Sequence, residues 1–458
     1  MGFKPIFEEE RLLFLEKTGI DLPTDCWRNG SKIYLDFTQD KPLLQFRVEN
    51  KEIVITKNNI NGLKKGKTVV DLPIQKKIPE LINTYKDELF QKYNKSVSIL
   101  YDYLISNPND LYVVSHSGGK DSDVVYEVWK EAIGALKEYK PEIYSLINWN
   151  INFANTSNDT ADTYKKIKKL PVERLRILNP QKGWRRWLVE DKNYFVPSTF
   201  VRNCCSVYKE GQITKAYDNK KKTTMILGVR SFESIKRSEY EFKMDYKWRI
   251  NHFDKSTLPE PWTNLAPIVE WKDEDVWLFI LWKNIEFNRM YRYGFNRCGC
   301  LLCPYMSDYT DILVEKYYPK QYAWWMSILE MNYTTWCIED RLKWTLKEWQ
   351  LGQWKQGKSK EYWLINKKET PERVKELAEI KGISEEMSQK YFNRKCACGK
   401  ALNPTELAMY YKTFGRFEGR EDNRTPLCKK CFCKQLGITA KEYVSRVVKN
   451  TEDGCNLF

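Results

Sequence analysis

The segment 115–122 reads Ser-His-Ser-Gly-Gly-Lys-Asp-Ser and combines residue types that can bind a phosphate group. An apolar run at 111–115 predicts a buried strand before it, and a recurring apolar face over 121–137 predicts a helix after it. The two glycines let backbone N–H groups approach an anion, and the helix dipole favours negative charge at its N-terminus. The longer GxxxxGK[ST] loop is absent. We therefore expect this turn to hold nucleotide phosphates through Ser115, Ser117, Gly118, Gly119, Lys120, Asp121 and Ser122. The alternative is an ordinary glycine-rich turn.

Other polar residues should lie at the same edge of one sheet. Apolar runs at 145–153, 175–178 and 223–228 alternate with helical patterns, which predicts a parallel sheet with helices on both faces. Ligands bind at the carboxyl ends of such strands. Asn155, Thr156 and Gly228 would lie at that edge and join the nucleotide site.

Charged side chains could act on the nucleotide directly. Arg230 and Arg237 can each neutralise phosphate charge as a bidentate partner, and Lys120 adds a compact cation. Asp121 can cap the helix or help to place Mg²⁺. We expect these four to be the catalytic residues. For the arginines, ion pairs with neighbouring glutamates are the alternative.

Thirteen cysteines without the apolar core of a signal peptide favour metal binding or catalysis over disulfides. Cys204 and Cys205 are adjacent, and Cys300 and Cys303 form a CxxC pair. Such a set suits a 4Fe–4S cluster, because adjacent cysteines fit less easily around one tetrahedral zinc ion. Cys298 could replace or support one ligand. A structural zinc ion and buried free thiols are the alternatives.

A second metal site is predicted near the C-terminus. Its CxC and CxxC pairs are Cys396, Cys398, Cys428 and Cys431, with Cys433 two residues beyond. This spacing is typical of a structural zinc ribbon or treble clef, and unliganded thiols are the alternative. Basic residues lie close by in sequence, and basic modules of this kind often contact nucleic acid or protein.

The net charge of +15 favours polyanionic partners, although dispersed lysines can also serve solubility alone. No apolar run reaches membrane-spanning length, so we expect a cytoplasmic protein without a membrane partner. Tryptophans are dense over 304–395, where helices are predicted. Core packing explains them better than base stacking does.

These patterns predict an α/β protein in four parts. Residues 1–75 form a small β-rich unit in which we find no chemistry. Residues 76–306 form the parallel-sheet domain, which opens with a long helix over 77–106. A helical, tryptophan-rich segment follows over 307–395. A zinc-binding module over 396–458 ends the chain.

An ordered set of motifs resembles a known family. It comprises SGGKDS, Asn155-Thr156, Arg202-x-Cys-Cys-x-x-x-Lys209, the stretch 228–237, Pro267-Ile-Val-Glu-Trp271 and Gly299-Cys-Leu-Leu-Cys-Pro304. Together these resemble the phosphoadenosine phosphosulfate (PAPS) reductase family, and SGGKDS resembles the PP-loop of ATP pyrophosphatases. The paired cysteines are similar to those of the iron–sulfur branch. That branch includes adenylylsulfate reductases and the PP-loop component of DNA phosphorothioation systems.

The resemblance leaves two enzymatic functions open. Sulfonucleotide reductases carry a C-terminal Glu-Cys-Gly-(Ile/Leu)-His motif. This chain lacks that motif, and the stretch around Cys455 is the part of the sequence that most nearly resembles it. We therefore favour ATP cleavage to AMP and pyrophosphate, which activates a nucleic-acid or other acceptor for sulfur supplied by a donor or reductant protein. Reduction of PAPS or adenylyl sulfate to sulfite is the alternative, and a nucleotide-sensing module is the second alternative.

Overall fold

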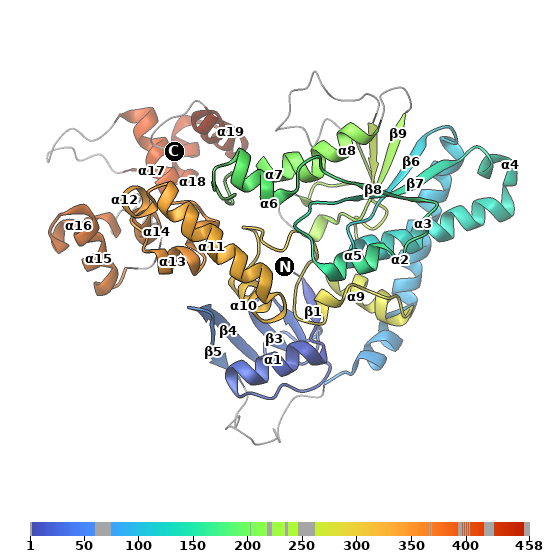
Figure 1. Cartoon of the computed structure of the whole chain (residues 1–458), viewed down its shortest axis with the longest axis horizontal. Coiled ribbons are helices and arrows are strands. Elements are labelled where there is room, and N and C mark those ends of the chain that lie inside the picture. Colours follow the sequence, from blue (N-terminus) through green and yellow to red (C-terminus); the bar gives the residue numbers. More distant parts are fainter. Residues whose placement is uncertain are drawn as a thin grey trace. The chain divides into compact units, whose positions relative to one another are not determined.

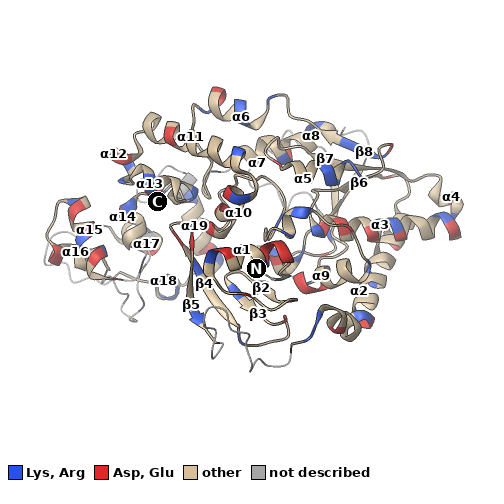
Figure 2. Cartoon of the chain, turned by 60° about the horizontal axis from the view of Figure 1, so that its bottom comes forward, with Lys and Arg blue, Asp and Glu red and all other residues tan. Residues whose placement is uncertain are grey.

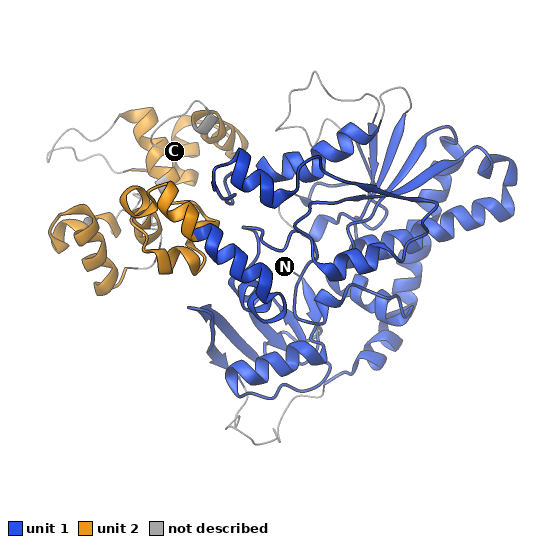
Figure 3. Cartoon of the chain, in the orientation of Figure 1, with its two compact units in different colours: residues 1–329 blue, residues 330–458 orange. Residues whose placement is uncertain are grey.

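The computed structural model describes residues 2–59, 75–201, 203–217, 222–233, 237–245, 262–365, 367, 369–392, 396, 398, 400, 402, 404–415 and 426–452. Cys455 lies outside these residues. The chain divides into two compact units, Met1–Leu329 and Glu330–Phe458 (Figure 3). The finer division at 75, 306 and 395 stays a prediction.

An antiparallel sheet opens the first unit, in the strand order β1-β2-β3-β4-β5. Its strands are β1 (Phe3–Pro5), β2 (Trp27–Asn29), β3 (Lys32–Tyr34), β4 (Leu44–Glu49) and β5 (Glu52–Asn58). Helix α1 (Glu8–Thr18) packs on this sheet, with the ring of Phe14 5.7 Å from that of Phe46. The β-rich character predicted for this part of the chain is confirmed.

A six-stranded sheet forms the centre of the first unit (Figure 1). Its order is β10-β11-β9-β6-β7-β8, and only β10 runs antiparallel to its neighbour. The bounds are β6 (Leu111–Ser115), β7 (Asn148–Ala154), β8 (Leu175–Leu178), β9 (Thr223–Leu227), β10 (Lys243–Asp245) and β11 (Trp262–Leu265). The predicted parallel sheet is confirmed, and β10 and β11 extend it beyond the predicted strands.

Helices cover both faces of this sheet, as the alternation of its side chains requires. Tyr112 and Val114 join the core with α2 (Ile78–Ser106), α3 (Lys120–Tyr139) and α9 (Asp273–Trp282), whereas Val113 faces α8 (Gly211–Ala216). The long helix predicted over 77–106 is confirmed as α2. The remaining helices of this unit are α4 (Pro141–Tyr144), α5 (Ala161–Ile167), α6 (Trp184–Arg186), α7 (Asn203–Cys205) and α10 (Asp308–Tyr317); α11 (Pro319–Thr335) crosses into the next.

The described residues of the second unit are helical. The bounds are α12 (Ile338–Leu342), α13 (Leu346–Gln350), α14 (Lys360–Ile365), α15 (Pro371–Lys381), α16 (Glu385–Phe392), α17 (Pro404–Phe414), α18 (Lys429–Leu436) and α19 (Ala440–Glu452). Trp344, Trp349 and Trp354 are buried, so core packing does account for these tryptophans. Basic and acidic residues are interspersed along the elements of each unit (Figure 2). No described helix is long and apolar enough to cross a bilayer.

Candidate functional site

The glycine-rich loop runs from the end of β6 into the first turn of α3. Gly118 has a φ of 76°, which a residue with a side chain adopts only with strain. Gly119 is the residue before the helix, and the next N–H group, that of Lys120, donates to the Tyr291 hydroxyl at 3.1 Å. The Asn288 amide donates to the Gly118 carbonyl at 3.2 Å. The loop geometry predicted from sequence is therefore present, and residues 288–291 hold it through these two hydrogen bonds.

Gly228 brings the end of β9 against the same helix. A Cβ added at this glycine would lie 2.9 Å from the carbonyl carbon of Asp121 and 3.0 Å from the N atom of Ser122. A side chain would therefore push β9 away from α3. The glycine at this position lets the backbone that carries Arg230 reach the loop.

Four charged side chains meet at the start of α3. The Nζ of Lys120 lies 2.9 Å from Oδ1 of Asp121 and 2.9 Å from Oδ1 of Asp273. Arg230 is 1% exposed and bridges the same two carboxylates at 2.7 and 2.8 Å. Burial alone would raise the pKa of Asp273, but Lys120 and Arg230 hold it at about 2. Lys120 and Arg230, two of the three cations predicted to bind phosphate, therefore already have carboxylate partners.

The remaining predicted nucleotide residues have various partners. The Oγ of Ser115 is buried and lacks a hydrogen-bond partner within the described part of the chain, which leaves it available to a ligand. Ser122 donates to the Gly119 carbonyl at 2.7 Å. Arg237 forms an ion pair with Glu233, the alternative weighed for it above.

Asn155 and Thr156 build the turn after β7. The Asn155 side chain accepts from the Ser157 N–H at 2.8 Å, and both the N–H and the hydroxyl of Thr156 donate to Asp159. The carbonyl of the intervening residue, Asn158, accepts from the Leu301 N–H at 2.8 Å. This turn thus holds the backbone of the CxxC segment.

The two predicted cysteine pairs face one another across this edge. A hydrogen bond with Cys205, burial, and the nearby thiols of Cys300 and Cys303 all raise the pKa of Cys204. Cations accompany them: Arg297 Nη2 lies 3.8 Å from the Cys303 sulfur, and the pKa of Lys209 is raised chiefly by Cys300. Positive charge beside gathered sulfurs suits thiolates and an anionic cluster.

The spacing of these sulfurs differs from that at the C-terminus. A group of at least three Cys, His, Asp or Glu side chains whose ligand atoms all lie within 4.8 Å of one another could hold a metal ion. Among the described residues, one such group occurs: Cys396, Cys398, Cys428 and Cys431. A four-iron cluster takes each thiolate on its own iron, so its ligand sulfurs lie further apart than those around one zinc ion. Within the described residues, no three sulfurs of Cys204, Cys205, Cys300 and Cys303 meet that 4.8 Å limit.

The C-terminal set fits one tetrahedral ion. The sulfurs of Cys398 and Cys428 lie 3.7 Å apart. Zn–S bonds of about 2.3 Å place the sulfurs of a tetrahedral site roughly 3.8 Å apart. Desolvation acts against ionisation of Cys396, but N–H groups of Cys398 and Cys428 lower its pKa to about 7. The structure thus brings the four predicted ligands together.

Cys298 lies beside the glycine-rich loop. Its Cβ is 3.9 Å from where a Cβ on Gly119 would lie, and its thiol shares a hydrogen bond with the Tyr291 hydroxyl. Burial raises the pKa of this thiol. This placement favours a packing role over the ligand role considered above.

Several functional residues are not evident from the sequence. Asp273 and Tyr291 stand in no motif with an assigned role, although Asp273 follows the Glu270-Trp271 pair closely. Asp123 is 3% exposed, and its Oδ1 lies 3.3 Å from His116 Nε2 and 3.0 Å from Lys166 Nζ. In turn, His116 Nδ1 accepts from the Gly118 N–H at 3.1 Å. A buried charge therefore supports the loop.

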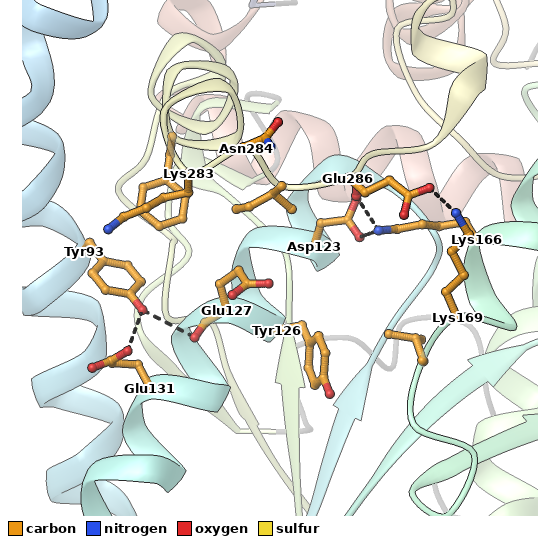
Figure 4. A pocket seen from close by; sticks show the side chains of 13 residues that line it. Tyr93, Asp123, Tyr126, Glu127, Glu131, Lys166, Lys169, Lys283, Asn284 and Glu286 are labelled. Carbon is orange, nitrogen blue, oxygen red and sulfur yellow. Dashed lines mark hydrogen bonds and ion pairs between the residues drawn. The ribbon is translucent and has the colours of Figure 1, made fainter.

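A pocket of about 490 Å³ lies beside that charge (Figure 4). Its wall includes Tyr93, Asp123, Glu131, Lys166 and Glu286. Tyr93 donates to Glu131, and Lys166 pairs with Asp123. No residue predicted for the nucleotide lines it, so it is distinct from the loop site.

The sequence is similar to a known family domain and to several known proteins. Residues 111–306 match the model of the phosphoadenosine phosphosulfate reductase domain. The chain is 28% identical over 319 residues to an uncharacterized protein of Methanocaldococcus jannaschii, covering 67% of this chain and 72% of that protein. It is 29% identical over 150 residues to the adenosine 5'-phosphosulfate reductase of Neisseria meningitidis serogroup A, covering 32% of this chain and 56% of the reductase.

A solved PAPS reductase from Candida auris, in a phosphate complex, aligns with a TM-score of 0.32 and 15% identity, covering 50% of this chain and 97% of that one. The family match spans the central sheet, the glycine-rich loop and both cysteine pairs of the first unit. Residues 111–306 of this chain are thus similar to the phosphoadenosine phosphosulfate reductase domain.

Proposed function

We propose that this protein binds ATP at the glycine-rich loop and cleaves it to AMP and pyrophosphate, so that an acceptor is activated for sulfur transfer. The acceptor oxygen attacks the α-phosphorus, the bond to pyrophosphate breaks, and a sulfur nucleophile later displaces AMP. Loop N–H groups, Lys120 and Arg230 bind the phosphates and stabilise the charge that develops on pyrophosphate. Asn155, Thr156, Gly228 and Ser115 complete the nucleotide site.

One observation carries the choice of ATP. Asp121 and Asp273 place two carboxylates beside the phosphate-binding cations. Mg²⁺ binds through one or two carboxylates together with substrate phosphates, and ATP brings this cation whereas a sulfonucleotide does not need it. The net charge of +15 supports a polyanionic acceptor such as nucleic acid.

Two metal groups belong to this proposal. Cys204, Cys205, Cys300 and Cys303 hold a 4Fe–4S cluster next to the nucleotide, where it supplies electron-transfer or sulfur chemistry when bound. Cys396, Cys398, Cys428 and Cys431 hold a structural zinc ion in the second unit. The zinc assignment rests on the sulfur spacing given above.

Reduction of PAPS or adenylyl sulfate is the second candidate. It is favoured by the similarity to adenosine 5'-phosphosulfate reductases over 150 residues. That chemistry needs a thiol that attacks the sulfate sulfur, and Cys455 is the cysteine nearest the C-terminus in the sequence.

One experiment separates the candidates. Protein purified without oxygen is incubated with ATP and Mg²⁺, with PAPS, and with adenylyl sulfate, and both pyrophosphate and sulfite are measured. We expect pyrophosphate from ATP and no sulfite, with Cys455→Ser as active as the wild type. Sulfite from either sulfonucleotide, lost in Cys455→Ser, would establish the reductase instead.

A further inference from the structure

We propose that a buried ion cluster in the N-terminal sheet, Lys4, Glu10 and Arg28, positions the loop that carries Cys300 and Cys303. These three residues, called here the clamp, lie far from the loop in sequence. The proposal rests on the cluster-bearing function proposed above, and it assigns a role to a part of the chain in which sequence analysis finds no chemistry.

Arg28 holds the chain just before the cysteines. It lies in β2 and is 3% exposed. Its Nη2 donates to the Gly294 carbonyl at 2.7 Å and to the side-chain oxygen of Asn296 at 2.9 Å. Arg297, whose guanidinium lies beside the Cys303 sulfur, follows directly. One buried guanidinium thus fixes the backbone and a side chain at the entry to the cysteine loop.

Glu10 fixes that guanidinium. It is 1% exposed on α1, accepts from Arg28 Nε at 2.7 Å and pairs with Lys4. Gly294 packs directly on its side chain: an added Cβ would lie 2.9 Å from the Glu10 carboxyl carbon, and the glycine φ is 109°. A larger residue at this position would clash with Glu10. The backbone at Gly294, just before the cysteine loop, therefore packs directly against the clamp.

Tyr309 brings the far end of the loop to the same clamp. It lies in the first turn of α10, six residues after Cys303, and its ring lies 4.8 Å from the Arg28 guanidinium. Its hydroxyl donates to Glu10 at 3.4 Å. Both ends of the segment 297–308 are therefore bound by the same two buried charges, while the Leu301 N–H holds its middle to Asn158.

Because the charges of the clamp are buried, they favour one position of the cysteine loop. Two cations and one carboxylate share an interior site, so each hydrogen bond to a loop carbonyl or amide offsets charge that has left water. Displacing the loop would leave the Arg28 guanidinium without those acceptors. The clamp consequently favours one loop position, which sets where Cys300 and Cys303 lie relative to Cys204 and Cys205.

The test compares Arg28→Lys with Asp36→Asn. Lysine keeps the charge but cannot reach Glu10, Gly294 and Asn296 with one planar fork. Asp36 is a buried acid two residues after β3 that accepts hydrogen bonds from the N–H groups of Thr38 and Lys76 instead of contacting the loop, so its variant controls for simple destabilisation. Iron per chain, the midpoint potential of the cluster, ATP affinity and the unfolding temperature are measured for each.

We expect Arg28→Lys to lose at least half of its iron or to shift the midpoint potential, with ATP affinity within twofold of the wild type. Asn296→Ala, which leaves the buried charges intact, should cause the same change more weakly. Asp36→Asn should lower the unfolding temperature at unchanged iron content. Iron loss that follows the loss of stability equally in Arg28→Lys and Asp36→Asn would overturn the proposal.

A second readout does not depend on the cluster. In metal-free protein, a thiol-alkylating reagent should label Cys300 and Cys303 at least twofold faster in Arg28→Lys than in the wild type. Unchanged labelling would overturn the clamp. Wild-type protein purified without iron would refute the cluster instead, and the labelling comparison would still decide this inference.

Discussion

Arg230 and Asp273 form an ion pair at 2.8 Å directly over the start of α3, and Lys120 reaches the same carboxylate oxygen at 2.9 Å. Because Asp121 pairs with both cations as well, Lys120 and Arg230 face two carboxylates. An incoming phosphate must displace those carboxylates or share them through a divalent cation. The affinity for the nucleotide should therefore depend on the Mg²⁺ concentration.

Asp273→Asn tests that connection. Removing one carboxylate leaves Lys120 and Arg230 with more net positive charge, so ATP should bind roughly tenfold more tightly without Mg²⁺, a factor typical of one charge-assisted hydrogen bond. The increase in ATP affinity on adding Mg²⁺ should be smaller in Asp273→Asn than in the wild type. Calorimetry with and without Mg²⁺ measures both. An unaltered Mg²⁺ dependence would show that Asp273 does not take part.

The same aspartate should contribute to acid stability. Its pKa lies at about 2 in the folded protein against an ordinary value of 3.8. A lowered pKa stabilises the fold above pH 3.8, and that stability is lost as the pH falls from 3.8 towards 2. The difference corresponds to roughly 2 kcal/mol. Denaturant unfolding at pH 7, 4 and 3 should show this loss in the wild type and its absence in Asp273→Asn.

Lys120→Ala should weaken nucleotide binding. A charge-assisted hydrogen bond to phosphate contributes about 1.5–3 kcal/mol, equivalent to roughly a tenfold to hundredfold increase in Kd. Lys130→Ala is the matched control, since Lys130 is a half-exposed lysine later in the same helix that pairs with Glu127. Equal affinities of the two variants in calorimetry would exclude Lys120 as a phosphate ligand.

Cysteine variants should separate cluster ligands from the packed thiol. Anaerobically purified wild type should be brown, and Cys300→Ser or Cys205→Ser should bleach it because each removes one thiolate ligand. Cys298→Ser should keep the colour, since that thiol lies beside Tyr291. Visible absorption and iron analysis measure the outcome. A colourless wild type with two zinc ions per chain would contradict the cluster.

The C-terminal set should hold one zinc ion of its own. Cys428→Ser removes a ligand whose sulfur lies 3.7 Å from that of Cys398, so one equivalent of zinc should be lost and the second unit should unfold more readily. Iron content should stay that of the wild type. Full zinc retention in the variant would exclude the four-cysteine site.

Much of the central sheet can be predicted because its strands are short apolar runs. Residues 175–178 form β8 as predicted, and 223–228 contain β9. Strand β11 is missed because Thr263 and Asn264 interrupt its pattern, although both are buried in the sheet. Burial of polar strand residues depends on neighbours that lie elsewhere in the chain.

The site can be predicted only where a motif marks it. Glycine spacing predicts the loop, and cysteine spacing predicts the four sulfurs that lie together near the C-terminus, since both patterns are local in sequence. Asp273 and Arg28 carry no such signal. Arg28 bonds to a carbonyl 266 positions away, and a lone arginine in a β-rich stretch most often lies at the surface.

That separation has a consequence for biogenesis. A ribosome makes Arg28 early and Gly294 more than half the chain later, so closing this contact spans a long, costly loop. The nascent chain can form its N-terminal sheet well before the cysteine loop exists. Tyr309 emerges later still, and only then can both ends of the loop be held. Insertion of iron should therefore follow translation of this region, and chains truncated before residue 309 should remain colourless.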